Sequence, residues 1–527
     1  MSPVSPNELV KYINDLKPHT ATGSDQISTI TIKAIKTHIV LPLLHIINTS
    51  FETGTYPHIF KTAVIKLIFK KGDKTLTNNY RPVCILTIFS KLHEKCIKRR
   101  IYNFLGENKL ISPNQFGFRS NMGTEDAIIN LTTQINYQID NNKKPLAVFL
   151  DLAKAFDTIS HSMLVDKLYN IGIRGVSLAL IKSYLQNREQ VVSINNVLSK
   201  PRIIKYGIPQ GTVLGPILFN VFINDLSQST VKCEITSFAD DTVLLFSTNS
   251  WKETHEVATS ELIKVKQWLD NNLLTLNSDK TTYITFSPRK NTQPVNSILK
   301  LHNPVCKQRN PNCKCHVLEK QYSTRYLGII IDQHLKWEDH IDFITKKLRC
   351  TIIMFHNLKN ILTHSNQKLV YFGLVQSRIQ YGIIAWGSAY DHYLQQLMSV
   401  QNVILKIIQN KEKRFSTEAL YEIANVFPVR KLFVASLNQF VYRHKLTTPC
   451  SNKEKIITRS KTNKHLFQIR VNKGITQRHP IFLSSKLYNL IPLHIRNIES
   501  NKGFKYSMKK WMKMYPMNKL NNIINCN

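Results

Sequence analysis

Two adjacent aspartates, Asp240 and Asp241, interrupt an otherwise apolar run that reads ITSFADDTVLLF. The apolar residues on both sides predict two core strands that are joined by a tight turn at the two acids. Two like charges side by side between core strands are costly unless a cation neutralises them. Because an Asp-Asp pair also occurs in ordinary exposed turns, the pair alone leaves both a cation site and a plain turn open.

A third acid follows another apolar run, in the segment KPLAVFLDLAKAFD. Residues 146–150 predict a buried strand, and Asp151 is the residue that emerges from its end at the edge of a sheet. Carboxylate oxygens are the hard ligands that Mg²⁺ prefers, and two divalent ions roughly 3.5–4 Å apart can clamp both oxygens of an in-line displacement. The sequence therefore predicts a divalent metal site built from Asp151, Asp240 and Asp241.

The charge of the chain favours a polyanionic partner. Its 527 residues include 71 Lys and Arg against 34 Asp and Glu, a formal net charge of +37 that is spread along the sequence. A basic groove gains affinity for nucleic acid by releasing counterions, so we expect a nucleic-acid partner, with a merely soluble basic protein as the alternative. No apolar run approaches the roughly 18 residues of a membrane span, and the N-terminus lacks a secretory signal, so we expect an intracellular chain without a membrane partner.

Strand and helix signals alternate as far as about residue 335, and long helical stretches follow. The segment 60–90 contains two β-rich runs around a Gly-Asp-Lys turn, which predicts a basic hairpin. The last hundred residues are basic and show no periodicity from which a role can be predicted. The other predicted elements are helices at 124–139, 256–274, 338–361, 366–380 and 391–409, short strands at 191–194 and 202–204, and a helix that follows GIPQGTVLGP and runs through residue 226.

Seven motifs follow one another in the order in which reverse transcriptases carry theirs: YRPVCIL, QFGFR, AVFLDLAKAFDTISH, GIPQGTVLGPILFNVFINDL, SFADD, LNSDKT and YLGIIID. Their wording resembles the insect jockey-type elements among the non-LTR (LINE-type) retrotransposons, and the resemblance covers roughly residues 20–335. It implies an RNA-directed DNA polymerase, a nucleotidyltransferase, with an α+β right-hand fold of fingers, palm with an antiparallel sheet, and helical thumb. The regions expected on this basis are an N-terminal extension at 1–59, fingers and palm at 60–335, a helical thumb-like region at 336–425 and a basic C-terminal region at 426–527.

The resemblance assigns the metal site to the three acids. Asp151 resembles the first metal-binding aspartate of the family, and FADD, with Asp240 and Asp241, resembles its [YF]-x-D-D box. The family implies that the main-chain carbonyl of Leu152 completes the coordination of two Mg²⁺ ions, for which Mn²⁺ is a substitute. Lys280 in LNSDKT resembles the lysine that protonates the departing pyrophosphate, although an ordinary exposed lysine would have the same sequence.

Four further residues are expected to contact the incoming nucleotide. Phe156 resembles the steric gate that rejects a ribose 2′-hydroxyl, whereas its spacing alone favours a core phenylalanine. Gln210 in GIPQG resembles the residue that contacts nucleotide and template, with the glycines allowing the backbone to approach a base pair; a plain turn is the alternative. Arg81 resembles the guanidinium that holds the triphosphate, and Lys70 is expected to assist it, unless both are solvated surface cations.

The segment YLGIIID resembles the primer grip of the family, a hairpin that supports the primer backbone. The resemblance assigns this role to Tyr326, Leu327 and Gly328. An ordinary edge hairpin is the alternative that the residues alone leave open.

Cys306, Cys313, Cys315 and His316 form the pattern C-x6-C-x-C-H just before YLGIIID. They are four candidate zinc ligands within eleven residues, although the spacing departs from that of standard zinc fingers. Nine cysteines scattered along a chain without a secretory signal are expected to be thiols, so free thiols in a variable insertion are the alternative.

The resemblance implies target-primed reverse transcription, in which the enzyme extends a nicked DNA end on the RNA of its own element. The implied partners are an RNA template, a DNA primer or target, and dNTPs, with the chain in a cytoplasmic ribonucleoprotein and in the nucleus where it acts; no oligomeric state is predicted. Because only some sixty residues precede the basic hairpin, we expect the endonuclease of such elements to be missing. The alternatives are a catalytically inactive nucleic-acid-binding remnant and a group II intron maturase, which shares the metal chemistry.

Overall fold

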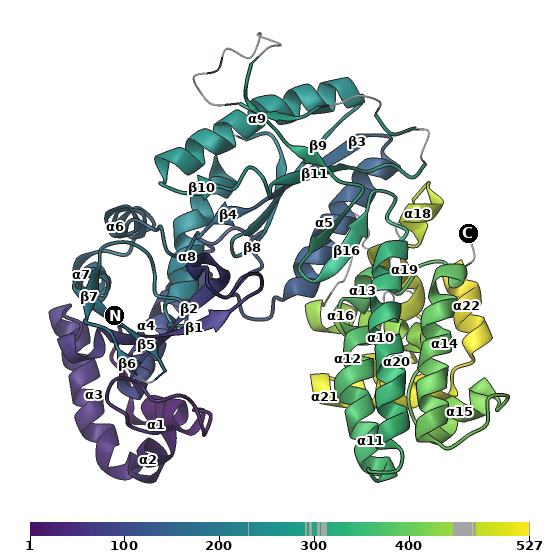
Figure 1. Ribbon diagram of the computed structural model, residues 1–527, viewed down its shortest axis with the longest axis horizontal. Helices are drawn as coiled ribbons and strands as arrows, with labels where there is room; N and C mark the ends of the chain where they lie inside the picture. The colour runs from purple at the N-terminus through teal and green to yellow at the C-terminus, as the bar shows by residue number, and fades with distance from the viewer. Residues whose placement is uncertain are drawn as a thin grey trace, which may run out of the picture.

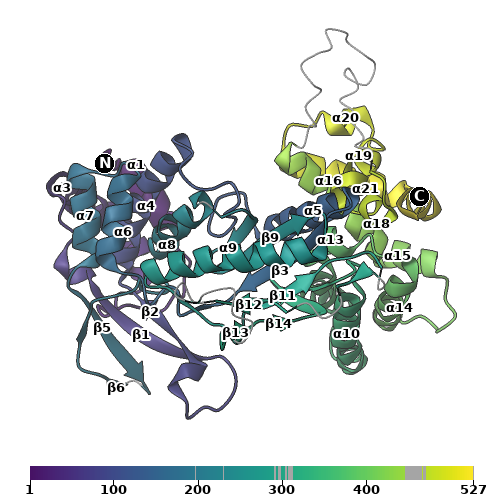
Figure 2. The ribbon, with the colours of Figure 1, turned by 90° about the horizontal axis from the view of Figure 1, so that it is seen from above.

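The computed structural model describes residues 1–195, 197–229, 231–289, 292–294, 298–302, 306, 313–445, 466 and 471–525. The ribbon forms an arch (Figure 1), with the N-terminal helices in one limb, a large β-sheet at the top and the C-terminal helices in the other limb. Seen from above (Figure 2), helix α9 (Trp251–Asn271) runs along the top between the two limbs. The mixture of helices and largely antiparallel sheet confirms the α+β class.

The N-terminal limb combines a small sheet with a layer of helices. β1 (Thr62–Phe69) pairs antiparallel with β2 (Tyr80–Ile85), which confirms the predicted basic hairpin, and parallel with β5 (Arg188–Ile194). β6 (Val197–Leu198) and β7 (Arg202–Ile204) pair with β5. The helices in this limb, or between it and the large sheet, are α1 (Pro6–Asn14), α2 (Thr29–Ala34), α3 (Lys36–Thr53), η1 (His58–Phe60), η2 (Thr77–Asn79), α4 (Ile88–Glu107), α6 (His161–Asn170), α7 (Gly175–Leu185), α8 (Gly215–Ile223) and η3 (Asn224–Gln228).

The large sheet has the strand order β14-β11-β3-β9-β8. Its strands are β3 (Lys144–Leu150), β8 (Glu234–Phe238), β9 (Asp241–Thr248), β11 (Thr282–Thr285) and β14 (Glu319–Lys320). Alternate residues of β3 point to opposite faces, as the pleat requires. Leu146 and Val148 share a hydrophobic cluster with residues of α9, whereas Ala147 lies in the cluster that contains Ile128 and Ile135 of α5 (Thr124–Asp140). The sheet is therefore covered on both faces, and the predicted helices at 124–139 and 256–274 are confirmed as α5 and α9.

Three small two-stranded units flank the large sheet. β4 (Leu152–Ala153) pairs with β10 (Thr275–Leu276), and β12 (Lys300–Leu301) pairs with β13 (His316–Val317). β15 (Ser323–Tyr326) and β16 (Ile329–Asp332) form a hairpin that leads into the C-terminal limb. These units adjoin Asp151, the segment 306–316 and the YLGIIID motif, respectively.

The C-terminal limb is helical and has one core. Its elements are α10 (Glu338–Leu358), α11 (His364–Tyr371), the π-helical turn η5 (Phe372–Gln376), α12 (Ser377–Gln380), α13 (Ile383–Trp386), α14 (Asp391–Ile408), α15 (Thr417–Ala424), α16 (Val429–His444), α18 (Gly474–Gln477), α19 (Pro480–Tyr488), α20 (Leu493–Arg496), α21 (Asn501–Met514) and α22 (Met517–Asn525). The helices predicted at 338–361, 366–380 and 391–409 are confirmed. Leu348, Leu397, Phe433 and Met508 belong to one hydrophobic cluster, so residues on both sides of position 425 share a core. Among the described residues, no helix has both the length and the apolar character needed to cross a bilayer.

Candidate active site

Asp151 follows the last residue of β3, at the edge where that strand leaves the sheet. Its main-chain carbonyl accepts a hydrogen bond from the Asn277 amide at 2.8 Å, and its amide donates to Thr281 Oγ1 at 3.3 Å. The backbone of Asp151 is thus fixed on both sides by the 277–281 loop, which joins β10 to β11. The carboxylate is free to face outward and is 43% exposed.

Asp240 and Asp241 lie at the turn between β8 and β9. Phe238 pairs with Asp241, so a two-residue hairpin turn joins the strands, as predicted, but the turn residues are Ala239 and Asp240, and Asp241 is the first residue of β9. Ala239 has a φ of +58°, a left-handed conformation that L-residues adopt only under constraint. Leu150 pairs with Thr242, and continuing this antiparallel register by one residue brings Asp151 opposite Asp241. Asp151 and the adjacent pair Asp240 and Asp241, which begins 89 residues later in the sequence, therefore meet at two adjacent strand ends.

The segment around Gln115 holds this turn in place. Gln115 Oε1 accepts hydrogen bonds from the Ala239 amide at 3.0 Å and the Gly117 amide at 2.9 Å, and the Gln115 side chain is buried. The Phe116 amide donates to the Ser237 carbonyl at 2.8 Å. A Cβ on Gly117 would lie 3.0 Å from Ala239 Cα, so only glycine allows this close approach. QFGFR is one of the seven motifs, but its sequence alone predicts no role for Gln115 or Gly117.

The electrostatics of the three acids are those of a site that favours cations. Burial, followed by repulsion from Asp240 and Asp151, raises the pKa of Asp241 to about 6, although one side of Asp241 is open to solvent. Burial also raises the pKa of Asp240, with Asp151 adding to the shift and Arg81 opposing it. Partly buried carboxylates that repel one another are stabilised by a divalent ion, and their oxygens are suitable ligands for one. Among the described residues, the three carboxylates are not gathered as tightly as the Cys and His side chains discussed below.

Two cationic side chains approach these carboxylates. Lys280 Nζ lies 3.9 Å from Asp151 Oδ2 and is 72% exposed, so the ammonium extends into the open space beside the acids. Arg81 is exposed on β2, opposite Ile68 of β1, and is near enough to influence Asp240. Lys70 follows the end of β1 and is also exposed; its amide donates to the Asn79 carbonyl at 2.8 Å.

Phe156 is half-buried among aromatic rings. It stacks on Phe219 with a centroid distance of 4.2 Å and an interplanar angle of 18°, and Phe118 meets it edge-on at 6.2 Å. Its carbonyl accepts a hydrogen bond from the Ile208 amide at 2.8 Å, which ties it to the GIPQG segment. One face of the ring is thus fixed by packing while part of the side chain reaches the surface.

The GIPQG loop is positioned by β2 and by Asp157. Gln210 Nε2 donates to Asp157 Oδ1 at 3.0 Å, and the Gln210 carbonyl accepts from the Cys84 amide at 2.7 Å. Gly211 has a φ of +100°, and a Cβ there would lie 2.8 Å from the Cys84 carbonyl oxygen. In the described chain, the glycine therefore permits close approach to the protein's own β2 strand, a contact that the sequence analysis did not predict.

A buried carboxylate anchors the helix that follows this loop. Glu94 accepts hydrogen bonds from the amides of Val213 at 2.6 Å and Leu214 at 3.1 Å and from the Tyr184 hydroxyl at 3.0 Å. Burial raises the pKa of Glu94, while the neighbouring Arg188 guanidinium and these donors oppose the shift. Amides at the start of a helix favour an anion, so Glu94 fixes the N-terminus of α8. Its only sequence signal is an acid on the buried face of a helix.

The hairpin β15–β16 places Tyr326 beside the acids. Tyr326 is buried, its ring lies 5.8 Å from that of Phe149, and burial followed by the charge of Asp241 raises the pKa of its hydroxyl. Leu327 and Gly328 both have positive φ, which is the geometry of a type I′ turn. Tyr381 donates its hydroxyl hydrogen to the Leu327 carbonyl at 2.6 Å, so the turn is braced from the C-terminal limb.

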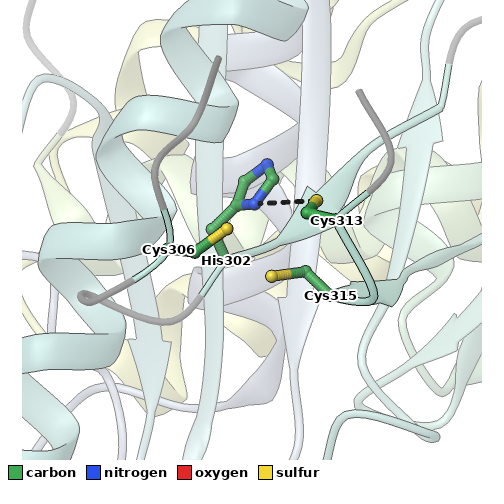
Figure 3. A group of neighbouring side chains, drawn as sticks. All are labelled: His302, Cys306, Cys313 and Cys315. Atoms are coloured by element: carbon green, nitrogen blue, oxygen red, sulfur yellow. Dashed lines mark hydrogen bonds between the residues drawn. The ribbon is translucent and has the colours of Figure 1, made fainter. Parts of the chain in front are cut away.

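Only three of the four predicted zinc ligands are gathered together. Cys306, Cys313 and Cys315 lie around His302 (Figure 3), and His316 is outside this group. His316 Nε2 instead lies 3.9 Å from Asp279 Oδ1. Successive residues of an extended strand point to opposite sides, so adjacent Cys315 and His316 do not reach the same point.

The motifs, the sheet register and the grouped acids agree with the comparison to known families. The model of the family "Reverse transcriptase (RNA-dependent DNA polymerase)" matches residues 68–331, and the chain belongs to this family. Within it, the sequence is similar to the polymerases of non-LTR retrotransposons of the jockey-like type.

Two Drosophila melanogaster relatives illustrate this relationship. The probable RNA-directed DNA polymerase from transposon BS is 28% identical over 84% of this chain and 48% of its own length, and the RNA-directed DNA polymerase from mobile element jockey is 27% identical over 77% and 44%. The chain thus spans about half the length of the curated relatives it matches. Among solved structures, telomerase from Candida albicans in complex with a telomeric RNA fragment aligns with a TM-score of 0.38 at 12% identity, covering 76% of this chain and 68% of that one.

Proposed function

We propose that this chain is an RNA-directed DNA polymerase that adds dNTPs to a primer 3′-hydroxyl on an RNA template. The observation that carries the proposal is the meeting of Asp151, Asp240 and Asp241 at adjacent strand ends, where two of them have raised pKa values. Two Mg²⁺ ions held there, or Mn²⁺ in their place, would stabilise the attacking and leaving oxygens of nucleotidyl transfer. The carboxylates and the Leu152 carbonyl supply the hard oxygen ligands that such ions require.

The arch suits the right-hand arrangement of a polymerase. We assign residues 60–335 to fingers and palm, with the large sheet as the palm and β1–β2 in the fingers. Residues 336–425 would be the thumb, residues 1–59 an N-terminal extension and residues 426–527 a basic C-terminal region. In this assignment the acids lie at the palm edge, at the end of β3 and at the turn between β8 and β9. The large sheet that carries them joins the two limbs of the arch (Figure 1), and a primer–template duplex could contact both limbs.

The residues around the acids suit the handling of a nucleotide. Arg81 presents a forked guanidinium to phosphate oxygens, with Lys70 at the end of the neighbouring strand. Phe156 is backed by Phe219, so its ring resists displacement and could reject a ribose 2′-hydroxyl by steric exclusion. Gln210 donates a hydrogen bond to Asp157, the residue that follows Phe156, and could contact the nucleotide and the template from this position.

Lys280 and the β15–β16 hairpin complete the proposed site. Lys280 can donate a proton to the departing pyrophosphate because its ammonium lies beside Asp151 and is open to solvent. Tyr326, Leu327 and Gly328 would support the primer backbone beside Asp241. The braced type I′ turn gives this support a fixed geometry.

The proposed partners are an RNA template, a DNA primer or target, and dNTPs. The net charge of +37 supports binding to phosphate backbones through counterion release. We further propose that the chain acts by target-primed reverse transcription, in the nucleus at its target and in the cytoplasm as a ribonucleoprotein.

Primer extension on poly(rA)/oligo(dT) with Mg²⁺ tests the proposed activity. The wild-type chain should incorporate dTTP, whereas Asp240→Asn should abolish synthesis and leave RNA binding nearly unchanged, because it removes a metal ligand and no phosphate contact. A wild-type chain that binds the template but adds no nucleotide would instead indicate a nucleic-acid-binding remnant. Specific splicing of an intron RNA would indicate a maturase.

A further inference from the structure

A second cluster of metal-ligating side chains lies outside the polymerase site. His302, Cys306, Cys313 and Cys315 each direct one ligand atom to a common point, and these atoms all lie within 4.8 Å of one another (Figure 3). The distance from His302 Nδ1 to Cys313 Sγ is 3.6 Å. Tetrahedral zinc, with Zn–S near 2.3 Å and Zn–N near 2.0–2.1 Å, separates a sulfur and a nitrogen ligand by about 3.6 Å. The observed distance is therefore the one that zinc ligands would have.

The backbone positions His302 and Cys315 close together without a bound ion. Leu301 pairs with His316 in the β12–β13 ladder, so His302 and Cys315, the adjoining residues, lie across from each other at the end of the ladder. Leu299, Leu301 and Leu318 are buried in the hydrophobic cluster that also contains residues of α9. The His302 side chain is itself only 5% exposed. A histidine fixed by core packing next to cysteines loses little conformational freedom when it binds a metal.

The charge around the cluster is suited to thiolate ligands. Three thiolates, a neutral imidazole and Zn²⁺ together carry one negative charge. Lys300 Nζ lies 3.8 Å from Cys313 Sγ and 3.4 Å from the Cys313 carbonyl oxygen, where it can balance that charge by hydrogen bonding to a coordinating sulfur. A disulfide between two of the cysteines would leave the third cysteine and His302 without a ligand role.

We infer that His302, Cys306, Cys313 and Cys315 form a structural Cys₃His zinc site that fixes the β12–β13 hairpin. This ligand set replaces the His316 of the sequence-based set with His302. His316 is then free to contact Asp279, whose neighbour Lys280 lies 3.9 Å from Asp151. Zinc would thereby stabilise the loop that carries Lys280, a consequence that rests on the proposed polymerase function, whereas zinc binding itself does not.

Zinc content of the purified full-length chain tests the site directly. After loading with Zn²⁺ and gel filtration, wild type should retain about one zinc per chain by plasma mass spectrometry. His302→Ala and Cys313→Ser should weaken zinc binding by more than about 100-fold, because losses outside the ligand shell alone cost about 10–100-fold. His316→Ala and Cys350→Ser are the matched controls and should retain the ion, since Cys350 is an exposed thiol on α10.

Two results of the zinc measurement would overturn the inference, and a third would come from cobalt substitution. A wild-type chain that retains no zinc after loading would exclude the site, and loss of zinc in His316→Ala together with retention in His302→Ala would exclude the ligand set. If Cys313→Ser fails to fold by circular dichroism, Co²⁺ substitution in wild type decides: absorption typical of a tetrahedral thiolate site supports the inference, and an octahedral spectrum contradicts it. Failure of primer extension with zinc retained would count only against the polymerase proposal.

Discussion

Replacing Gly117 with alanine should disable the proposed polymerase site without changing any of the three proposed metal ligands. The added Cβ would lie 3.0 Å from both Ala239 Cα and Phe238 C, and closer still to the Ala239 nitrogen. Optimal contacts between carbon atoms are about 3.5–4.0 Å, and the contact of the added Cβ with the Ala239 nitrogen would be shorter than its 3.0 Å contacts with carbon, so the β8–β9 turn must move away by roughly 1 Å or more. Because Gln115 holds this turn through the Ala239 amide, the displacement should also weaken that hydrogen bond. The two aspartates that follow Ala239 would move with it.

The expected loss can be estimated from this displacement. A misplacement of about 1 Å at a catalytic group costs roughly 10²-fold in rate, equivalent to about 2.7 kcal/mol of transition-state stabilisation. Single-nucleotide incorporation under single-turnover conditions, with Mg²⁺ and a saturating primer–template, measures the rate. Template affinity should change little, because the turn contributes carboxylates and no cations.

Gly106→Ala is the matched control. Gly106 lies in α4 with nothing within 4 Å of an added Cβ, so the substitution should leave the rate unchanged and stabilise the helix by up to about 1 kcal/mol. If Gly117→Ala incorporated nucleotides as fast as Gly106→Ala, the brace between Gln115 and the acidic turn would not control the site.

Four other perturbations follow from the same geometry. Asp241 must be ionised to bind a metal, and its pKa is raised to about 6, so the rate of Mg²⁺-dependent synthesis should fall as the pH drops through 6. A higher Mg²⁺ concentration should move this acidic limb of the pH–rate profile to lower pH. A rate that does not depend on pH between about 5 and 7 would contradict this expectation. The raised pKa also means that the metal-free fold loses stability as the pH rises from 3.8, the usual pKa of Asp, to about 6, because Asp241 ionises less readily in the folded state. Asp241→Asn should therefore raise the melting temperature at about pH 7.5 and not at about pH 4. The gain in free energy of unfolding should be at most about 1 kcal/mol, because Asp241 is partly exposed to solvent. Phe156→Val should admit ribonucleotides, which competition between rNTPs and dNTPs measures; unchanged discrimination would remove Phe156 from the gate. Tyr326→Phe should keep or raise thermal stability, since the buried Tyr326 hydroxyl has no hydrogen-bond partner in the described chain, and a clear loss would reveal one.

The elements that support the acids could be predicted because their signals are local. An apolar run followed by an acid predicts the end of β3, and apolar runs on both sides of two acids predict the β8–β9 hairpin. The amphipathic spacing of 124–139 and the long helices after 336 are equally local patterns. The pairing of Leu150 with Thr242, which brings the acids together, could not be predicted from the sequence, since no periodicity encodes which strands are neighbours.

The residues that sequence reasoning missed act through long-range contacts. Gln115 and Gly117 serve a turn more than 120 residues away, and Glu94 caps a helix at a similar distance. Spacing along the chain favours His316 as the fourth ligand, because it directly follows Cys315, whereas His302 lies four residues before Cys306. The β12–β13 register, and the alternation of Cys315 and His316, decide which histidine reaches the sulfur atoms.

The central claim is that the three acids hold the metal ions for templated DNA synthesis, and Asp151→Asn tests it most directly. We expect wild type to add the dNTP complementary to a heteropolymeric RNA template at a rate that rises with Mg²⁺. Asp151→Asn should bind the same primer–template with similar affinity and show no incorporation at any Mg²⁺ concentration. Incorporation by Asp151→Asn at the wild-type rate would contradict the account.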